Sequence, residues 1–306
     1  MSHHRMYASA AFFGVLVIFA VFLSFRKGGL ILITSPAENT GRIRVVATFF
    51  PLYDFARVVG KDKIELSLLF TQTPEVASFA PGDIQKISQA DIVIKNGLGL
   101  EPVLDDLLAA SDNKGVTVVD TSAGVRLLDS AEPEEHKGAD PHIWLSPHNA
   151  MVQVSAIHDA LVAADPANAA FYQNNAMIYI EELRQLDRAI ESDIARFSRR
   201  DFVAFHSAFR YFAERYGLRQ VAVIEEFPGK EPSPRYIADV IRTIRDTGIA
   251  TIFAEPQFSP RIVEVIAHDL GLKIYTLDPI ETGDPAKDSY LSLMRRNLDV
   301  LKEAMQ

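Results

Sequence analysis

The sequence of 306 residues contains no cysteine. Thiolate sites are therefore excluded, and any metal site must be built from imidazole and carboxylate groups, a ligand set that suits zinc, manganese or ferrous iron. Basic residues are also in deficit, because 31 Lys and Arg stand against 40 Asp and Glu, giving a formal net charge of −9. No basic stripe with interleaved aromatic residues is present, so nucleic acid is not an expected partner.

An uncharged run from Ala8 to Phe25 lies between Arg5 and Arg26–Lys27. Its eighteen residues reach the lower limit for a helix that crosses a bilayer. No small-x-small cleavage motif follows it clearly, so residues 1–34 are interpreted as an uncleaved anchor, with a cleaved export signal as the alternative. Basic residues on both flanks leave the orientation open. Residues 35–42 read as a polar linker.

Beyond this linker, strand-like and helix-like segments alternate, a pattern typical of layered α/β domains. We predict two lobes, each a mainly parallel four-stranded sheet flanked by helices. The first lobe covers residues 43–165 and the second covers residues 200–306. The expected strands are 43–50, 64–70, 91–96 and 116–120 in the first lobe, and 201–206, 220–225, 250–255 and 273–278 in the second.

Residues 166–199, between the lobes, are predicted to form one long rigid helix. Apolar residues recur there every three or four positions from Tyr172 to Phe197, as on one face of a helix, and no Gly or Pro interrupts them. At 1.5 Å per residue, a helix over 167–198 would be roughly 48 Å long, which is enough to run along both lobes.

Four polar residues are placed where ligands bind in α/β proteins, at or beyond the carboxyl ends of strands. His206 ends one expected strand and Asp278 another; Glu75 follows a third by five residues, and His142 lies in the DPHIW loop. Singly, each has a structural explanation: His206 as a helix cap, Asp278 as the start of a turn before Pro279, and Glu75 as a surface residue. Two from each lobe, taken together, favour a shared site in the cleft.

Several motifs, in this order and spacing, resemble the metal-binding receptors of bacterial zinc and manganese ABC importers, the cluster A-I solute-binding proteins. The similarity runs from about Arg44 to Met305 and includes VVATFFPLYDFARVVGKD, DPHIWLSPHNA, HSAFRYFAERYGL, FAEPQFSPRIVEVIA and DSYLSLMRRNLDVL. The resemblance implies two α/β lobes joined by one long helix, with a single divalent cation between them.

Carried over by position, the second, third and fourth ligands of that family fall on His142, His206 and Asp278. The first ligand departs from the pattern, because Pro74 is followed by Glu75 where the family usually has histidine. We expect Glu75 to supply a carboxylate oxygen, with water at an empty position as the alternative. Glu255 in FAEPQ is a candidate for orienting a ligand, with structural burial equally open.

The implied function is capture of a divalent metal ion and delivery to the permease of an ABC importer, without catalysis. His206 favours zinc, whereas two carboxylates among four ligands are nearer to the manganese type. The receptor is expected to be a monomer on the periplasmic or extracellular face of the cytoplasmic membrane. Because histidine must lose its proton to bind metal, affinity should fall below pH 6.5.

Two other classes stay open on the sequence alone. A zinc hydrolase would use His142, His206 and Asp278 as three ligands, with Glu255 or Glu75 as general base, although neither an H-E-x-x-H helix nor a nucleophile elbow is present. A membrane-tethered adhesin would need its metal only for stability. His136, in the acidic stretch 132–140, is either the remnant of a His-rich loop or part of an ordinary surface loop.

Overall fold

The computed structural model describes residues 41–130 and 138–306. The predicted anchor, most of the linker and His136 lie outside the described residues, and those predictions stand as they were. Within the described ranges, no helix combines the length and the apolarity needed to cross a bilayer. Residues 41–306 form one compact unit.

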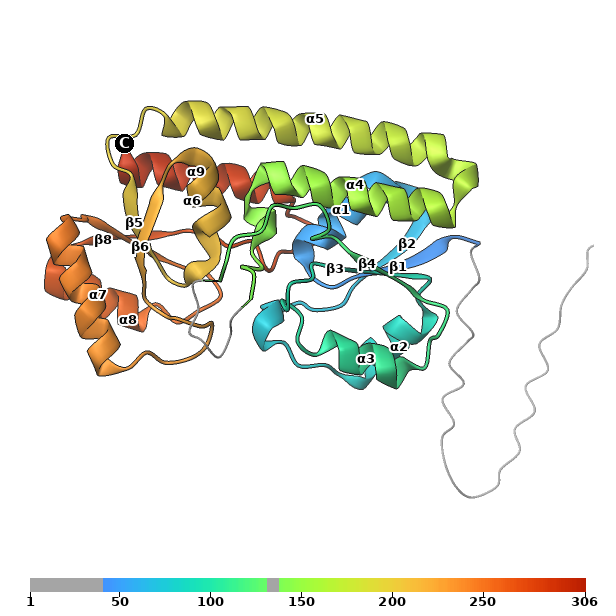
Figure 1. Ribbon diagram of the computed structural model, residues 1–306, viewed down its shortest axis with the longest axis horizontal. Coiled ribbons are helices and arrows are strands. Elements are labelled where there is room, and N and C mark those ends of the chain that lie inside the picture. Colours follow the sequence, from blue (N-terminus) through green and yellow to red (C-terminus); the bar gives the residue numbers. More distant parts are fainter. Residues whose placement is uncertain (1–40, 131–137) are drawn as a thin grey trace, which may run out of the picture. The chain divides into compact units, whose positions relative to one another are not determined.

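The first lobe contains a four-stranded parallel sheet in the order β2-β1-β3-β4. Helices α2 and α3 lie on one side of this sheet, and α1 and α4 on the other (Figure 1). The expected sheet is therefore confirmed. The elements are β1 (Ile43–Ala47), α1 (Phe50–Gly60), β2 (Ile64–Leu68), α2 (Pro81–Gln89), β3 (Ile92–Lys95), α3 (Leu104–Ser111), β4 (Thr117–Asp120) and α4 (Pro147–Ala164).

The second lobe contains two parallel pairs, β5-β6 and β7-β8, instead of the single four-stranded ladder that we expected. The β5–β6 pairing shifts register between Phe202 and Val203, where Val221 of β6 is passed over, and β7 packs beside β5 through buried side chains. The elements are β5 (Asp201–Ala204), α6 (Arg210–Tyr216), β6 (Arg219–Val223), α7 (Pro234–Thr247), β7 (Thr251–Ala254), α8 (Arg261–Leu270), β8 (Lys273–Thr276) and α9 (Tyr290–Met305).

The long connecting helix is present as α5, which spans Ala169–Ile194 without a break. Its 26 residues give a length of about 39 Å. The apolar face expected from the sequence is buried, with Tyr172, Leu183 and Ile190 all fully inaccessible to solvent. α5 lies along both lobes, whereas α4 lies over the first lobe and α9 over the second (Figure 1), and both pack against α5.

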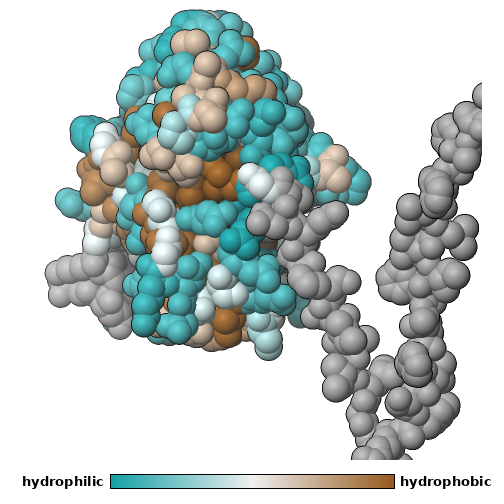
Figure 2. Space-filling view, turned by 90° about the vertical axis from the view of Figure 1, so that its right-hand side faces the viewer, coloured by the Kyte–Doolittle hydropathy of each residue, from teal (hydrophilic) through white to brown (hydrophobic). Residues whose placement is uncertain are grey.

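Exposed hydrophobic residues are confined to part of the surface. Figure 2 shows a face that is largely hydrophilic, with hydrophobic residues gathered in a band across its middle. The buried side chains include Trp144, Tyr172 and Tyr290, which belong to one large hydrophobic cluster shared by elements of both lobes. This shared cluster restrains how far the lobes can move apart, because opening it would expose large apolar side chains to water.

Candidate metal site

Four side chains from four separate loops converge between the lobes: Glu75, His142, His206 and Glu281. Each follows a strand or opens a short turn. Glu75 lies in the 3-10 turn Pro74–Val76 beyond β2, and His142 precedes the 3-10 turn Ile143–Leu145. His206 follows β5, and Glu281 lies in the loop after β8. Parallel strands end at the same edge of their sheet, which brings these loops together.

The potential ligand atoms of these four residues all lie within 4.8 Å of one another. Nε2 of His142 is 3.1 Å from Oε1 of Glu75, and Nε2 of His206 is 3.3 Å from Oε1 of Glu281. The two Nε2 atoms are 3.2 Å apart. Metal–ligand bonds of about 2.0–2.1 Å in a tetrahedral zinc site place neighbouring ligand atoms roughly 3.3 Å apart, which these separations match.

A second pair of carboxylates orients the imidazoles. Nδ1 of His142 is 2.9 Å from Oδ1 of Asp140, and Nδ1 of His206 is 2.6 Å from Oε2 of Glu255. An Nδ1–H that donates to a carboxylate leaves the lone pair of Nε2 directed into the site, which is the arrangement of metal-binding histidines. The predicted contact of Glu255 with a ligand is therefore present in the structure, and Asp140 plays the same part for His142.

The four converging side chains are all buried. The side chains of His142, His206 and Glu281 are 3%, 1% and 0% exposed, and that of Glu75 is 8% exposed. Apart from these two imidazoles, the described part of the chain offers the oxygens of Glu75 and Glu281 no hydrogen-bond partner. Buried carboxylates with so few partners are costly, so this arrangement requires a positive charge between them.

Protons supply that charge when no metal is bound. Burial lowers the pKa of His142, but the carboxylates of Asp140 and Glu75 outweigh it and raise the pKa to about 10. Burial also opposes the charge on His206, and Glu255 and Glu281 raise the pKa of that imidazole well above its ordinary value. The donor set consequently favours a cation strongly, and a divalent metal ion must displace protons in order to bind.

The structure brings together three of the four ligands predicted from the sequence, and it places Glu281 in the position that we expected for Asp278. Oδ1 of Asp278 accepts a hydrogen bond of 2.7 Å from the backbone N–H of Ile280. Ile280 has a φ of 59°, so the chain reverses there and directs Glu281 inward. Asp278 therefore begins a turn, which was the structural alternative that its place before Pro279 suggested.

Burial raises the pKa of Asp278 to about 6, with the nearby charges of Glu281 and Glu255 adding to the effect. The loop that carries both acidic residues is tied to the first lobe, because Trp144 Nε1 donates to the carbonyl of Pro279 at 2.8 Å. Tyr290 in turn donates its hydroxyl hydrogen to the carbonyl of Trp144 at 2.6 Å. These bonds fix the Glu281 loop relative to His142, which lies two residues before Trp144.

Sequence reasoning missed Asp140 and Glu281. Asp140 is two residues before His142 in the DPHIW motif, and a carboxylate so close to a predicted ligand was a signal that the sequence offered. Glu281 gave no such signal, because LDPIE places two acidic residues within four positions and only the backbone turn decides which one faces the other ligands.

The fold and the site together define a two-lobed α/β protein that can enclose a single metal ion. The family model described as "Zinc-uptake complex component A periplasmic" (ZnuA) matches residues 45–304. The chain belongs to this family. The expected resemblance to metal-binding receptors is thereby confirmed, as is the fold class of two α/β lobes with a long connecting helix.

Individual relatives agree with the family. The zinc-binding lipoprotein AdcA of Streptococcus pneumoniae strain R6 is 31% identical over 290 residues, which cover 90% of this chain and 58% of AdcA. The chain thus spans little more than half the length of that relative. The high-affinity zinc uptake system protein ZnuA of Bacillus subtilis is 29% identical over 310 residues, covering 95% of this chain and 97% of ZnuA.

A similar solved structure is that of the solute-binding protein FpvC from Pseudomonas aeruginosa in complex with Mn²⁺. The two chains are 32% identical and superpose with a TM-score of 0.78, covering 87% of this chain and 99% of FpvC. Relatives of the same fold are therefore described with different divalent ions, zinc in AdcA and manganese in FpvC.

Proposed function

We propose that this protein is an extracytoplasmic receptor that captures one divalent transition-metal ion between its lobes and passes it to the permease of an ABC importer. The observation that carries the proposal is the convergence, within a buried site, of two imidazole Nε2 atoms and two carboxylates that have no hydrogen-bond partner besides these imidazoles. Membership of the zinc-uptake family supports import as the purpose of the binding.

In this proposal the ligands are Glu75, His142, His206 and Glu281. Zinc is the first candidate, because imidazole ligands and separations near 3.3 Å suit a tetrahedral zinc ion. Manganese is the second candidate, because carboxylate oxygens make up half of the set and manganese favours oxygen donors. Asp140 and Glu255 hold the imidazoles in the metal-binding tautomer.

We expect capture and release of the metal ion to involve movement of loops more than movement of whole lobes. Since a shared hydrophobic cluster and the unbroken helix α5 join the lobes, we expect metal release through movement of a ligand-bearing loop. The turn that carries Glu75 is the best candidate, because this side chain is the most exposed of the four. We propose that permease docking withdraws Glu75 and that the remaining ligands then release the ion.

The four converging side chains leave no open position of the kind that a three-ligand zinc hydrolase needs for its water, so we propose a receptor without catalytic activity. We also propose that the receptor acts as a monomer at the outer face of the cytoplasmic membrane. The uncharged segment 8–25 would tether it there or would direct its export.

The test is native mass spectrometry with elemental analysis of the full chain, stripped of metal and then exposed to zinc or manganese. We expect one ion per chain in the wild type and none in His206→Ala. Glu75→Ala should bind the ion more weakly. Wild-type protein that retains no metal, or His206→Ala that retains one, would refute the proposal.

Circular dichroism of the stripped protein separates a receptor from an adhesin that uses metal for stability. A receptor should stay folded without the ion and bind it again. Unfolding on removal of the metal would support the adhesin instead. Hydrolysis of model esters that follows bound zinc, and that disappears in His206→Ala, would support the hydrolase.

A further inference from the structure

Two neighbouring residues of α6, Arg210 and Tyr211, contact the first lobe beside the metal site. Nη1 of Arg210 lies 3.4 Å from Oδ2 of Asp140, and it also donates to the backbone carbonyl of Asp129. The hydroxyl of Tyr211 donates to the backbone carbonyl of Asp140 at 2.9 Å. Both side chains of the second lobe therefore hold the residue that orients the imidazole of His142.

The two carboxylate oxygens of Asp140 have separate partners. Oδ1 accepts hydrogen bonds from the backbone N–H of His142 at 3.0 Å and from Nδ1 of the same residue at 2.9 Å, whereas Oδ2 faces Arg210. The terminal torsion of an aspartate side chain is soft, so an unsupported carboxylate can turn away from its partner. Because the ion pair with Arg210 resists this rotation, it keeps Oδ1 in line with Nδ1 of His142.

Tyr211 fixes the backbone that leads into His142. Its hydroxyl accepts a hydrogen bond of 3.1 Å from the N–H of Leu128 and donates to the carbonyl of Asp140. Leu128 and Asp140 are also bonded to each other, since the N–H of Asp140 donates to the carbonyl of Leu128 at 2.8 Å. Tyr211 is 3% exposed, and a buried hydroxyl that both donates and accepts specifies one position for the chain that it contacts.

The segment that carries these two residues also carries a metal ligand. His206 follows β5, and Arg210 begins α6 four residues later. The second lobe thus offers one imidazole to the site and, through Asp140, supports the imidazole that the first lobe offers. A displacement of α6 relative to the first lobe would disturb His142 as well as His206.

We propose that Arg210 and Tyr211 are positioning residues for the metal ligand His142 and that they act through Asp140. The inference rests on the proposed metal-binding function and deepens it. Its effect has the opposite sign to that of simple electrostatics. Removal of a positive charge close to a cation site would by itself strengthen cation binding, whereas loss of the support for His142 should weaken it.

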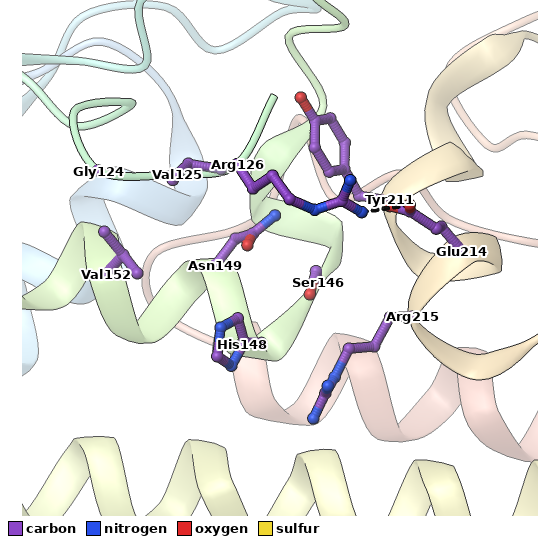
Figure 3. Close-up of a pocket in the computed structure, with 10 residues that line it drawn as sticks. All are labelled: Gly124, Val125, Arg126, Ser146, His148, Asn149, Val152, Tyr211, Glu214 and Arg215. Carbon is purple, nitrogen blue, oxygen red and sulfur yellow. Dashed lines mark hydrogen bonds and ion pairs between the residues drawn. The ribbon is translucent and has the colours of Figure 1, made fainter. Parts of the chain in front are cut away.

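The same helix carries a matched pair of residues with a different partner. Nη2 of Arg215 lies 2.5 Å from Oδ2 of Asp187 in α5, and the hydroxyl of Tyr216 donates to Oδ1 of Asp187 at 2.8 Å. Figure 3 shows the hydroxyl of Tyr211 and the guanidinium of Arg215 pointing away from each other. Substitutions of Arg215 and Tyr216 therefore remove the same chemical groups without touching Asp140.

Zinc affinity of the full chain in a nonionic detergent, measured by competition with a chelator, compares Arg210→Met and Tyr211→Phe with Arg215→Met and Tyr216→Phe. Groups that orient metal ligands typically contribute roughly 10–100-fold in affinity, so we expect the first two variants to bind zinc about tenfold more weakly. Arg210→Lys should recover most of the loss, because one nitrogen of Arg210 makes both contacts and an ammonium keeps the charge. The other two variants should unfold at lower urea concentration and keep the wild-type zinc affinity.

Proton NMR of the zinc-bound protein follows the supported imidazole directly. The hydrogen-bonded Nδ1–H of His142, assigned by its absence in His142→Gln, should exchange with water faster in Arg210→Met and in Tyr211→Phe than in the wild type. Zinc affinity equal to or higher than that of the wild type in both variants would overturn the inference and leave the proposed function standing. An equal loss of affinity in the Arg215 and Tyr216 variants would overturn it as well, because the effect would then be general destabilisation. A wild type that binds no zinc or manganese would refute the proposed function and this inference together.

Discussion

Exchange of Glu281 for glutamine should impair metal binding far more than exchange of Asp278 for asparagine. Both substitutions remove one negative charge from the same loop and change the volume little, so they form a matched pair. The two replaced side chains differ in the groups that they contact. Glu281 is fully buried and contacts only Nε2 of His206, whereas Asp278 accepts a hydrogen bond from the backbone of Ile280 that an asparagine oxygen can also accept.

The magnitude follows from the position of each group. Loss of a group that only orients a metal ligand typically lowers affinity 10–100-fold, so loss of a direct ligand should exceed roughly 100-fold, or about 2.7 kcal/mol. Asp278→Asn preserves the turn that directs Glu281 inward. We therefore expect its affinity to stay within about tenfold of the wild type.

Competition with a fluorescent zinc chelator measures both affinities at one pH. Thermal unfolding of the Glu281→Gln protein, with and without zinc, provides a second measurement. Its melting temperature should rise less on addition of zinc. The reverse order, with Asp278→Asn the weaker binder by two orders of magnitude or more, would refute the assignment and restore Asp278 as the fourth ligand.

Three further outcomes are expected. Because the pKa of His142 is raised from 6.5 to about 10, protons compete with metal for this imidazole across that pH range. The apparent zinc affinity should therefore rise with pH, by roughly tenfold per pH unit for each displaced proton. A zinc affinity that does not change with pH, measured by chelator competition at constant ionic strength, would contradict this. Trp144→Phe removes the donor to the carbonyl of Pro279 and should cost about 1–3 kcal/mol in urea unfolding, with weaker metal binding because the Glu281 loop loosens. Asp54 accepts hydrogen bonds from Tyr290 N at 2.9 Å and from the hydroxyl of Tyr179 at 3.3 Å, so Asp54→Ala should destabilise the protein by a similar amount, whereas an unchanged urea midpoint would exclude a structural role.

The sequence was sufficient to predict the α/β architecture and the long helix. Alternation of strand-like and helix-like segments is a local pattern, and the apolar face from Tyr172 to Phe197 is a local periodicity. Both predictions are confirmed, because burial of one helix face and burial of successive parallel strands depend on residue type and spacing along the chain. The division of the second lobe into two strand pairs was not predictable, because hydrogen bonding between β5 and β7 depends on how neighbouring elements pack.

The candidate site was predictable in part. His142 and His206 were identified because they lie at or beyond strand ends together with other polar residues and because both fall in motifs of the resemblance. Glu75 was identified through its place after Pro74, and its 3.1 Å contact with Nε2 of His142 agrees with that expectation. Asp140 was overlooked although it lies beside His142 in the sequence.

The sequence by itself determined which chemical groups could bind a metal ion. These are imidazoles and carboxylates, with no thiolate, and they lie on loops at the ends of parallel strands. Only the tertiary structure decided between Asp278 and Glu281, because the two lie three residues apart and a single backbone reversal at Ile280 selects the one that faces the histidines. Such a choice depends on the φ of one residue and on the bond from Trp144 to Pro279, a contact across 135 positions of the chain.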